Sequence, residues 1–227
     1  GARASEGRSQ EELFKANRAI AKEVAETFIG SSTLFVVASD PVDLMTAELT
    51  RLLKLPSSRV MGVGGVVDSF RVRHAIGEIL SYSPDSVRSH VIGPQGSESQ
   101  ILWEYTSVNG VPLKELTDGE TIEKTRELLN SESHSKTWLM AESPSRYTPA
   151  LACLELIRCL VQDDRRVLSV TMSSPELTGI PGVAMSVPAI VGRFGAERHI
   201  LPELGPESRK RLDSQAKKLA STLEELG

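Results

Sequence analysis

The sequence lacks three features that would point to particular classes of protein. It has no excess of basic residues, since 26 lysines and arginines stand against 30 acidic residues, and a dedicated nucleic-acid-binding protein would normally be basic. It has no apolar run near the roughly 18 residues of a membrane helix, and no signal peptide at its start. We therefore expect a cytoplasmic protein with neither nucleic acid nor membrane as partner. One well-placed arginine would still be enough to bind a small anion.

Cysteine is also scarce, with only Cys153 and Cys159 in the chain. They lie six residues apart in a predicted helix, which places the two sulfurs on different faces and argues against a disulfide. No histidine pair accompanies them, so the pattern is not that of a zinc site and we predict no metal. We expect two small buried apolar side chains.

Strands and helices alternate in the first 80 residues, which favours βαβ units and a parallel sheet. A continuous apolar run over 33–38 predicts a strand buried on both faces, and a second short strand is expected over 59–63. Helices are expected over 42–54 and 66–80. The segment from Gly62 to Gly65 lacks the third glycine of a nucleotide-binding turn, so we assign it to the start of the helix instead.

After Gly96 the pattern is mixed, so the chain combines an α/β first part with an α+β second part. Asn109-Gly110 predicts a tight turn after an extended stretch. The remaining strands are expected over 87–92, 167–172 and 184–191, and the remaining helices near 119–130, 146–162 and the end of the chain.

Two helices have apolar stripes that predict their buried faces. The first follows Ser9, a predicted N-cap, and ends at Gly30. Its stripe consists of Leu13, Ala16, Ile20, Val24 and Phe28. The stripe of the last helix consists of Leu212, Ala216, Leu219, Leu223 and Leu226.

Two stretches carry charged residues that could take part in ligand binding or catalysis. The stretch from Ala38 to Asp43 lies at the carboxyl end of the strand over 33–38, at the sheet edge where open α/β sheets bind ligands. The simpler interpretation is a strand-to-helix turn capped by Asp40. In the second stretch Asp68 and Arg71 share a helix face, whereas Arg73 does not. The simpler interpretation there is a surface ion pair, and the functional one is an arginine that grips a substrate carboxylate.

The third stretch is a tight loop over 93–96 that presents Gln95 after a strand. A glutamine amide forms hydrogen bonds but has no proton to exchange near neutral pH.

In this order and spacing, the three stretches resemble the lactate/malate dehydrogenase family. The stretch 40–43 matches the family's Asn-Pro-Val-Asp, 67–73 matches Leu-Asp-Ser-x-Arg-x-Arg, and 93–96 matches the catalytic Gly-x-His-Gly loop. Residues 134–143 and 186–192 are similar to later family segments. The resemblance covers essentially the whole chain.

The resemblance implies the fold class and the domains. We expect α/β architecture, with the second half of a Rossmann-type parallel sheet in a dinucleotide-binding domain over 1–65. An α+β substrate domain of the lactate/malate dehydrogenase type follows over 66–227. The opening residues resemble the family's mobile active-site loop, so the phosphate-binding glycine turn would precede them. The strand over 33–38 would then need partner strands from another segment or subunit, and residues 1–227 alone should be poorly soluble.

The family transfers a hydride between NAD and C2 of a 2-hydroxy or 2-oxo acid, while a histidine held by an aspartate moves the proton. By resemblance Asp68 is that aspartate, and Arg71 binds the substrate carboxylate. The implied cofactor-binding positions are Ala38, Asp40 and Met140, the last packing against the nicotinamide; an ordinary core methionine is the alternative there.

Four departures from the family pattern act against catalysis. Gln95 stands at the position of the histidine. Gln10 stands at that of the loop arginine that polarises the substrate carbonyl if no gap is allowed, and Arg8, two residues earlier, is the alternative. Ala4 falls on the substrate-selecting position without a polar group, and Asp40 replaces an asparagine that donates a hydrogen bond. Positioned acid–base catalysis contributes roughly 10²–10⁴-fold, which Gln95 cannot supply.

We therefore expect a degenerate dehydrogenase fold that acts as a binding or scaffold domain and senses a 2-oxo acid or NAD. The alternative is an active NAD-dependent 2-hydroxyacid dehydrogenase with altered specificity. The resemblance further implies a homo-oligomer. Gln95 and the stretch 37–42 are also similar to eukaryotic proteins that fuse a ubiquitin-conjugating-enzyme-variant domain to such a fold, which implies an upstream domain of that kind.

Overall fold

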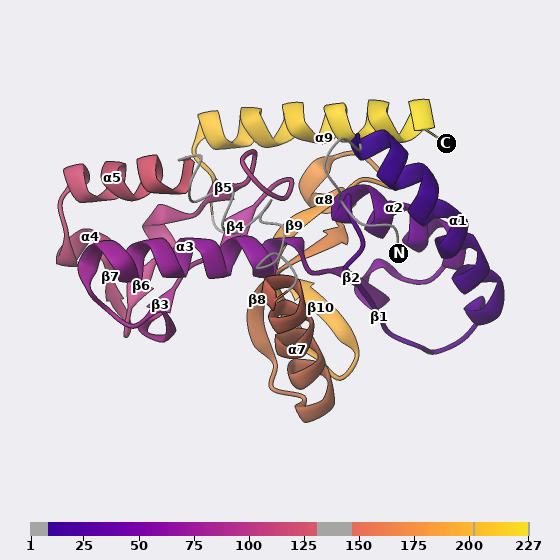
Figure 1. The fold of residues 1–227 in the computed structure, drawn as a ribbon, viewed down its shortest axis with the longest axis horizontal. Coiled ribbons are helices and arrows are strands. Elements are labelled where there is room, and N and C mark those ends of the chain that lie inside the picture. The colour runs from indigo at the N-terminus through magenta and orange to yellow at the C-terminus, as the bar shows by residue number, and fades with distance from the viewer. Residues whose placement is uncertain (1–8, 131–146, 202, 227) are drawn as a thin grey trace.

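The computed structural model describes residues 9–130, 147–201 and 203–226. Its centre is a five-stranded mixed sheet in the order β1-β2-β8-β9-β10 (Figure 1). The strands β1 and β2 pair in parallel, and the other neighbours are antiparallel. The five strands are β1 (Phe35–Val37), β2 (Val60–Gly62), β8 (Arg166–Ser173), β9 (Ala184–Gly192) and β10 (Gly195–His199). The predicted α/β class with a parallel strand pair is confirmed.

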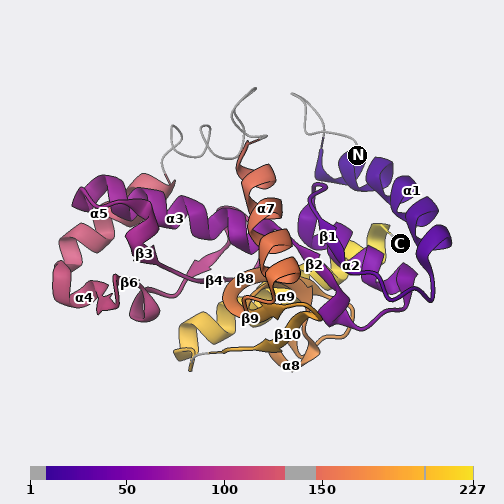
Figure 2. The same ribbon diagram turned by 90° about the horizontal axis from the view of Figure 1, so that it is seen from below.

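Several helices pack against this sheet, and α5 packs against one of them, α3. In Figure 2 the helices α1 and α5 lie at opposite ends of an elongated molecule, and in Figure 1 α9 runs along one long edge. Helix α3 packs against β8, and α7 against β9. The helices are α1 (Gln10–Phe28), α2 (Val42–Leu53), α3 (Gly64–Leu80), α4 (Leu113–Leu116), α5 (Gly119–Asn130), α7 (Tyr147–Gln162), α8 (Pro175–Thr178) and α9 (Pro206–Leu226). No described helix is both long enough and apolar enough to cross a membrane.

The predicted strand over 87–92 is wrong as a single strand. It divides into β3 (Val87–Arg88) and β4 (Val91–Ile92), which belong to different small sheets. The division depends on a contact with the central sheet, because the Val91 N–H donates to the Ser169 hydroxyl of β8 at 3.0 Å. Two small sheets result, β3-β6-β7 and β4-β5, in which β5 is Gln100–Ile101, β6 is Ser107–Val108 and β7 is Val111–Pro112.

The tight turn at Asn109-Gly110 is confirmed. It joins β6 to β7, and the φ angles of 49° and 87° at these two residues match the left-handed backbone of a two-residue hairpin turn.

The apolar stripe predicted for α1 is largely wrong. Leu13 is buried, but Ala16, Ile20 and Phe28 are exposed. The face that contacts the core carries Phe14, Asn17, Ala21 and Ala25. Asn17 explains the error, because its side-chain amide donates to the Asp40 carbonyl at 2.7 Å and so brings a polar residue into the buried face. The predicted N-cap is confirmed, since Ser9 forms a capping box with Glu12.

The strand over 33–38 is shorter and less buried than predicted. Only Val37 of β1 is fully buried, and Phe35 and Val36 are half-buried. The strand lies at the edge of the sheet and pairs with β2 in the parallel sense expected. The strand β10 was not predicted, because its sequence, Gly-Ala-Glu-Arg-His, has no apolar run.

The stripe of the last helix is confirmed. Leu212 and Ala216 are fully buried, and the later leucines of the stripe pack against the same core. Cys159 is fully buried, Cys153 is half-buried, and both are free thiols. Strands from both sides of residue 65 join in one sheet, through a single residue pair between Gly62 and Thr171. The predicted domain division stays a prediction.

Candidate functional site

A tight loop over 93–96 lies between β4 and β5. Gly93 forms two backbone hydrogen bonds with Ser186 of β9, of 3.0 and 2.9 Å. Gly93 and Gly96 have φ angles of +93° and +94°, which glycine adopts without steric cost. The loop is therefore fixed at its start to the central sheet, and its sequence permits the sharp reversal that presents residue 95.

Two buried carboxylates hold the middle of this loop. Asp43, in the first turn of α2, accepts the Gln95 N–H at 2.8 Å and the Thr171 hydroxyl at 3.1 Å. Asp68 of α3 accepts the Gly96 N–H, also at 2.8 Å. Neighbouring backbone amides are thus bound by carboxylates from different helices.

Asp68 also pairs with Arg71 one helical turn further on. The distance from Asp68 Oδ1 to the Arg71 guanidinium is 3.1 Å, and the two residues are only 1% and 5% exposed. The shared face is confirmed, but the interpretation as a surface ion pair is wrong, because the ion pair is buried. A second Arg71 nitrogen donates to the Leu129 carbonyl at 3.3 Å. The Arg71 Nε is buried and has no partner among the described residues.

Burial raises the pKa of both aspartates. For Asp43 the pKa reaches about 7, with repulsion from Asp68 and Asp40 adding to the effect of burial. For Asp68 the pKa reaches about 6, because the charge of Arg71 and the Gly96 N–H oppose the effect of burial. Both carboxyls therefore titrate close to neutral pH.

A small cavity opens beside this ion pair. It is lined by Asp68, Arg71, Gly96, Ser99 and Leu129, among others. Gln95 is half-buried in the same loop, and its Cβ lies 3.2 Å from the position that a Cβ on Gly64 would take. The structure thus places Gln95 on the loop that Asp68 holds, over the start of α3.

The other predicted site residues are more distant or lie outside the described part. Gln10 is exposed in the first turn of α1, and no described contact joins it to Asp68 or Arg71. Ala38 and Asp40 are exposed beyond the end of β1. Ala4 and Met140 lie outside the described residues.

Sequence reasoning missed the role of Asp43. Its place in the stretch 40–43 was the available signal, but nothing in that stretch indicates a contact with a loop fifty residues later in the chain.

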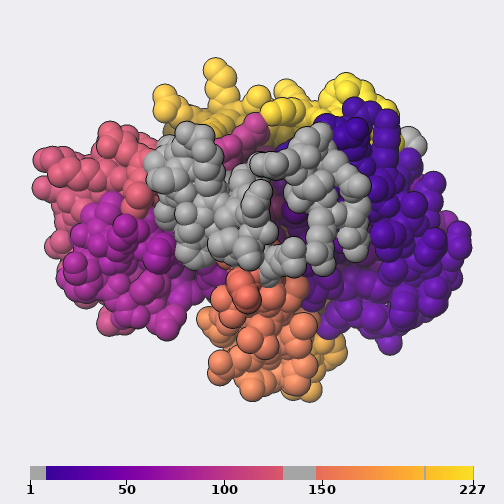
Figure 3. Space-filling view, in the orientation of Figure 1, coloured from indigo at the N-terminus to yellow at the C-terminus, as the bar shows by residue number. Residues whose placement is uncertain are grey.

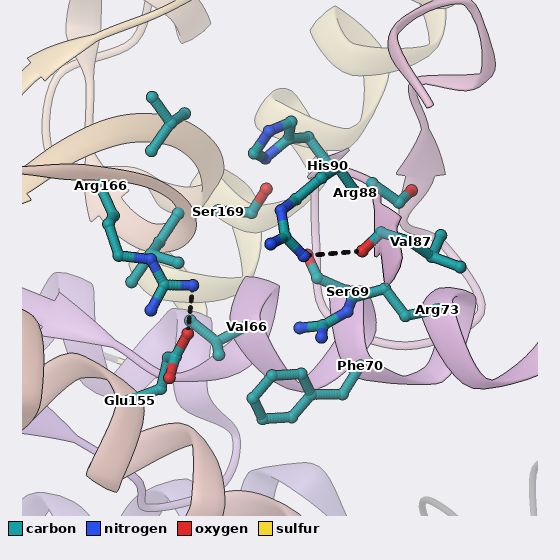
Figure 4. A pocket seen from close by; sticks show the side chains of 13 residues that line it. Val66, Ser69, Phe70, Arg73, Val87, Arg88, His90, Glu155, Arg166 and Ser169 are labelled. Carbon is teal, nitrogen blue, oxygen red and sulfur yellow. Dashed lines mark hydrogen bonds and ion pairs between the residues drawn. The ribbon is translucent and has the colours of Figure 1, made fainter. Parts of the chain in front are cut away.

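A second pocket lies on another face of α3 (Figure 4). Arg73, Arg88 and Arg166 border it, and each has a hydrogen-bond or ion-pair partner. Arg166 pairs with Glu155 at 2.7 Å, Arg73 pairs with the Asp85 carboxylate at 3.0 Å, and Arg88 donates to the Asp85 carbonyl at 2.8 Å. The prediction that Arg71 and Arg73 occupy different faces is confirmed.

The described residues include no cluster of three histidine, cysteine or acidic side chains that would hold a metal ion.

The sequence profile of the lactate/malate dehydrogenase α/β C-terminal domain matches residues 66–226. The chain belongs to the lactate/malate dehydrogenase family. It is 33% identical over 224 residues to malate dehydrogenase 1 of Aquifex aeolicus, covering 96% of this chain and 67% of that protein. It is 28% identical to an L-lactate dehydrogenase of a Synechococcus strain, covering 100% of this chain and 75% of that protein.

Solved structures of this family have the same fold. The malate dehydrogenase from Aeropyrum pernix superposes with a TM-score of 0.85 at 25% identity, over 99% of this chain and 73% of that one. The malate dehydrogenase from Salinibacter ruber superposes with a TM-score of 0.84 at 28% identity, over 96% of this chain and 72% of that one. The described architecture is thus that of the lactate/malate dehydrogenase family over nearly the whole chain.

Proposed function

We propose that this chain binds the carboxylate of a 2-hydroxy or 2-oxo acid at Arg71 and is impaired in hydride-transfer catalysis. The buried Arg71 guanidinium carries the proposal. Its Nε has no partner among the described residues, and it borders a cavity. A buried donor without a partner is costly, and a ligand carboxylate would satisfy it through charge-assisted hydrogen bonds.

The missing proton-transfer group supports the second half of the proposal. Gln95 can donate a hydrogen bond to a carbonyl oxygen but cannot exchange a proton with it near neutral pH. The three histidines among the described residues have contacts outside the site formed by Asp68, Arg71 and Gln95. His74 lies 3.9 Å from Glu78, His90 lines the second pocket, and His199 is bonded to Ser174 at 3.1 Å. His134 lies outside the described residues.

The preserved pair of Asp68 and Arg71 favours the other candidate, an active NAD-dependent 2-hydroxyacid dehydrogenase with altered specificity. The two candidates agree on the ligand and differ on turnover, so an assay of turnover separates them.

We propose NAD as the cofactor on the strength of the family. Ala38 and Asp40 would contact it, since both are accessible at the carboxyl end of β1, and Met140 is the third proposed contact. The Asp40 carboxylate fits the cofactor's carboxamide as an acceptor of its N–H, whereas an asparagine would also donate. The reduced cofactor, NADH, would supply the hydride to a 2-oxo acid, and NAD⁺ would accept it from a 2-hydroxy acid. A fluorescence titration with NADH tests this binding directly.

We also propose that the chain forms a homo-oligomer, because α7 has an exposed apolar stripe. In Figure 3 this helix protrudes at the edge of the molecule. Tyr147, Leu151, Leu154 and Val161 are 72%, 55%, 62% and 80% exposed and recur at spacings typical of one helix face. Light scattering of the wild type and a Leu154→Glu variant tests it: the variant should shift to monomer, and a monomeric wild type would contradict the proposal.

Two further proposals concern the location of the protein in the cell and the domain that precedes these residues. The free thiols agree with a cytoplasmic location, which cell fractionation tests. The sequence that precedes residue 1 in the parent chain tests the proposed ubiquitin-conjugating-enzyme-variant domain.

Pyruvate and pyruvamide test the carboxylate site by calorimetry, because they differ only in the charged group. We expect wild-type protein to bind pyruvate and not pyruvamide, and Arg71→Met to lose at least tenfold in affinity for pyruvate. Equal affinities for the two compounds, or an unchanged Arg71→Met variant, would refute the carboxylate site.

A further inference from the structure

Helix α9 sends one long polar side chain into the core. Gln215 is 7% exposed, and its neighbours on the same face, Leu212 and Ala216, are fully buried. A buried amide needs hydrogen-bond partners, so its contacts indicate why a glutamine stands at this apolar position.

Gln215 contacts both ends of the segment that contains the loop. Its Nε2 donates to the Glu98 carbonyl at 2.7 Å, and its Oε1 accepts from Gln100 Nε2 at 3.2 Å. The same Oε1 lies 3.0 Å from the position that a Cβ on Gly93 would occupy. One amide therefore spans the segment from residue 93 to residue 100.

The part of the segment between these contacts carries the two amides that the aspartates hold. Ser99 donates both its N–H and its hydroxyl to the Gly96 carbonyl, at 3.1 and 2.9 Å. These two hydrogen bonds close a short turn from Gly96 to Ser99, which contains Glu98. A displacement of Glu98 would be passed to Gly96 and hence to the hydrogen bond with Asp68. Asp68 in turn holds Arg71.

We propose that Gln215 is a positioning residue for the carboxylate site: from α9 it fixes the loop against Asp68, and so the orientation of Arg71. The inference rests on the proposed function for the ligand, but the loop geometry itself is measurable without one.

Three variants separate this role from general stabilisation. Gln215→Met keeps the length of the side chain and removes both hydrogen bonds. Gln215→Glu keeps the shape but, when ionised, has no donor for the Glu98 carbonyl. Lys218→Met is the matched control, because Lys218 lies on the same helix and pairs with the exposed Glu98 carboxylate at 2.7 Å without touching its carbonyl.

Hydrogen exchange at the Gln95 and Gly96 amides and the dissociation constant for pyruvate are measured on the full chain. Loss of a hydrogen bond of ordinary strength predicts roughly three- to tenfold faster exchange at these two amides in Gln215→Met, and a similar loss of affinity. Exchange in α2 and β8 should stay at the wild-type rate, and Lys218→Met should match the wild type.

The pH dependence of pyruvate binding by Gln215→Glu distinguishes a positioning role from general stabilisation, because a purely structural role would not change with pH. The charged groups near this side chain are Arg211, which donates to the same Glu98 carbonyl at 3.4 Å, and the pair of Lys218 and the Glu98 carboxylate. The loss of pyruvate affinity in Gln215→Glu, taken as a ratio to the wild type at each pH, should shrink from pH 8 to pH 5, because burial favours the neutral acid, which regains an O–H donor for the Glu98 carbonyl. The ratio for Gln215→Met should stay constant.

Unchanged exchange at Gln95 and Gly96 in Gln215→Met, or an equal increase throughout the protein, would overturn the inference. A pH-independent defect in Gln215→Glu would do the same. Failure of the wild type to bind pyruvate would overturn the proposed function instead, and the exchange result would still decide the role of Gln215.

Discussion

Asp43 and Asp68 bind adjacent peptide groups of one loop, each accepting a backbone N–H at 2.8 Å, from Gln95 and Gly96 respectively. They come from α2 and α3, so the position of the loop depends on how these two helices pack. Both carboxyls are buried with a raised pKa, about 7 for Asp43 and about 6 for Asp68. The hydrogen bonds favour the ionised forms and burial opposes them. The two hydrogen bonds that hold the loop therefore depend on the protonation of Asp43 and Asp68, and so on pH.

The first prediction concerns stability between pH 4 and pH 8. The pKa of Asp43 in the folded protein lies above its unfolded value of about 3.9. The folded state therefore holds the extra proton between about pH 4 and 7, and stability falls as pH rises through this window. Asp43→Asn removes the titration and keeps an acceptor for the Gln95 N–H. We expect urea unfolding to show a smaller fall for this variant, by roughly 1–3 kcal/mol.

Asp85→Asn is the control for this measurement, because the Asp85 side chain is exposed. It should follow the wild-type pH dependence. Identical slopes for the wild type and Asp43→Asn would show that the carboxyl of Asp43 does not titrate in this range.

The second prediction concerns the buried ion pair. Arg71→Met leaves Asp68 without its cation, so we expect a loss of about 3 kcal/mol or more in the free energy of unfolding at pH 8. The double variant Asp68→Asn/Arg71→Met should regain much of this loss, because no unpaired buried charge remains. A double-mutant cycle in urea measures the coupling. Additive losses would mean that the two side chains do not interact as the 3.1 Å contact indicates.

A third prediction follows from the start of α3. A Cβ on Gly65 would lie 2.6 Å from the Ser169 carbonyl oxygen, so Gly65→Ala must push α3 away from β8. We expect a loss of roughly 1–3 kcal/mol in unfolding free energy and weaker pyruvate binding, because α3 carries Asp68 and Arg71. Gly119→Ala is the matched control, since its added Cβ would meet no atom of the described residues within 4 Å beyond its chain neighbours and its own helix backbone. Equal behaviour of the two variants would contradict the close packing.

Much of the fold could be predicted because its signals are local. The helices over 42–53 and 64–80 and the turn at Asn109-Gly110 follow from periodicity and turn chemistry. The burial of α1 could not be read from its apolar spacing, because Asn17 enters the core to bond the Asp40 carbonyl. The division of the strand over 87–92 depends on Ser169, which lies far away in the sequence.

The candidate site was predictable in part for the same reason. Asp68 and Arg71 share a helix face, which their spacing reveals. Their burial depends on α5 and on the loop over 93–96, and the roles of Asp43 and Gln215 depend on contacts with residues 52 and 117 positions away along the chain. Such contacts have no signature in a single sequence.

Steady-state oxidation of NADH with pyruvate or oxaloacetate, in the longest natural chain that contains these residues, tests the central proposal most directly. We predict that the wild type binds pyruvate and turns over at least 10²-fold below an ordinary rate of about 10 s⁻¹. Gln95→His should raise the rate by roughly 10²-fold, because an imidazole in this loop restores proton transfer beside Asp68. Wild-type turnover near 10 s⁻¹ would contradict the loss of the proton-transfer centre.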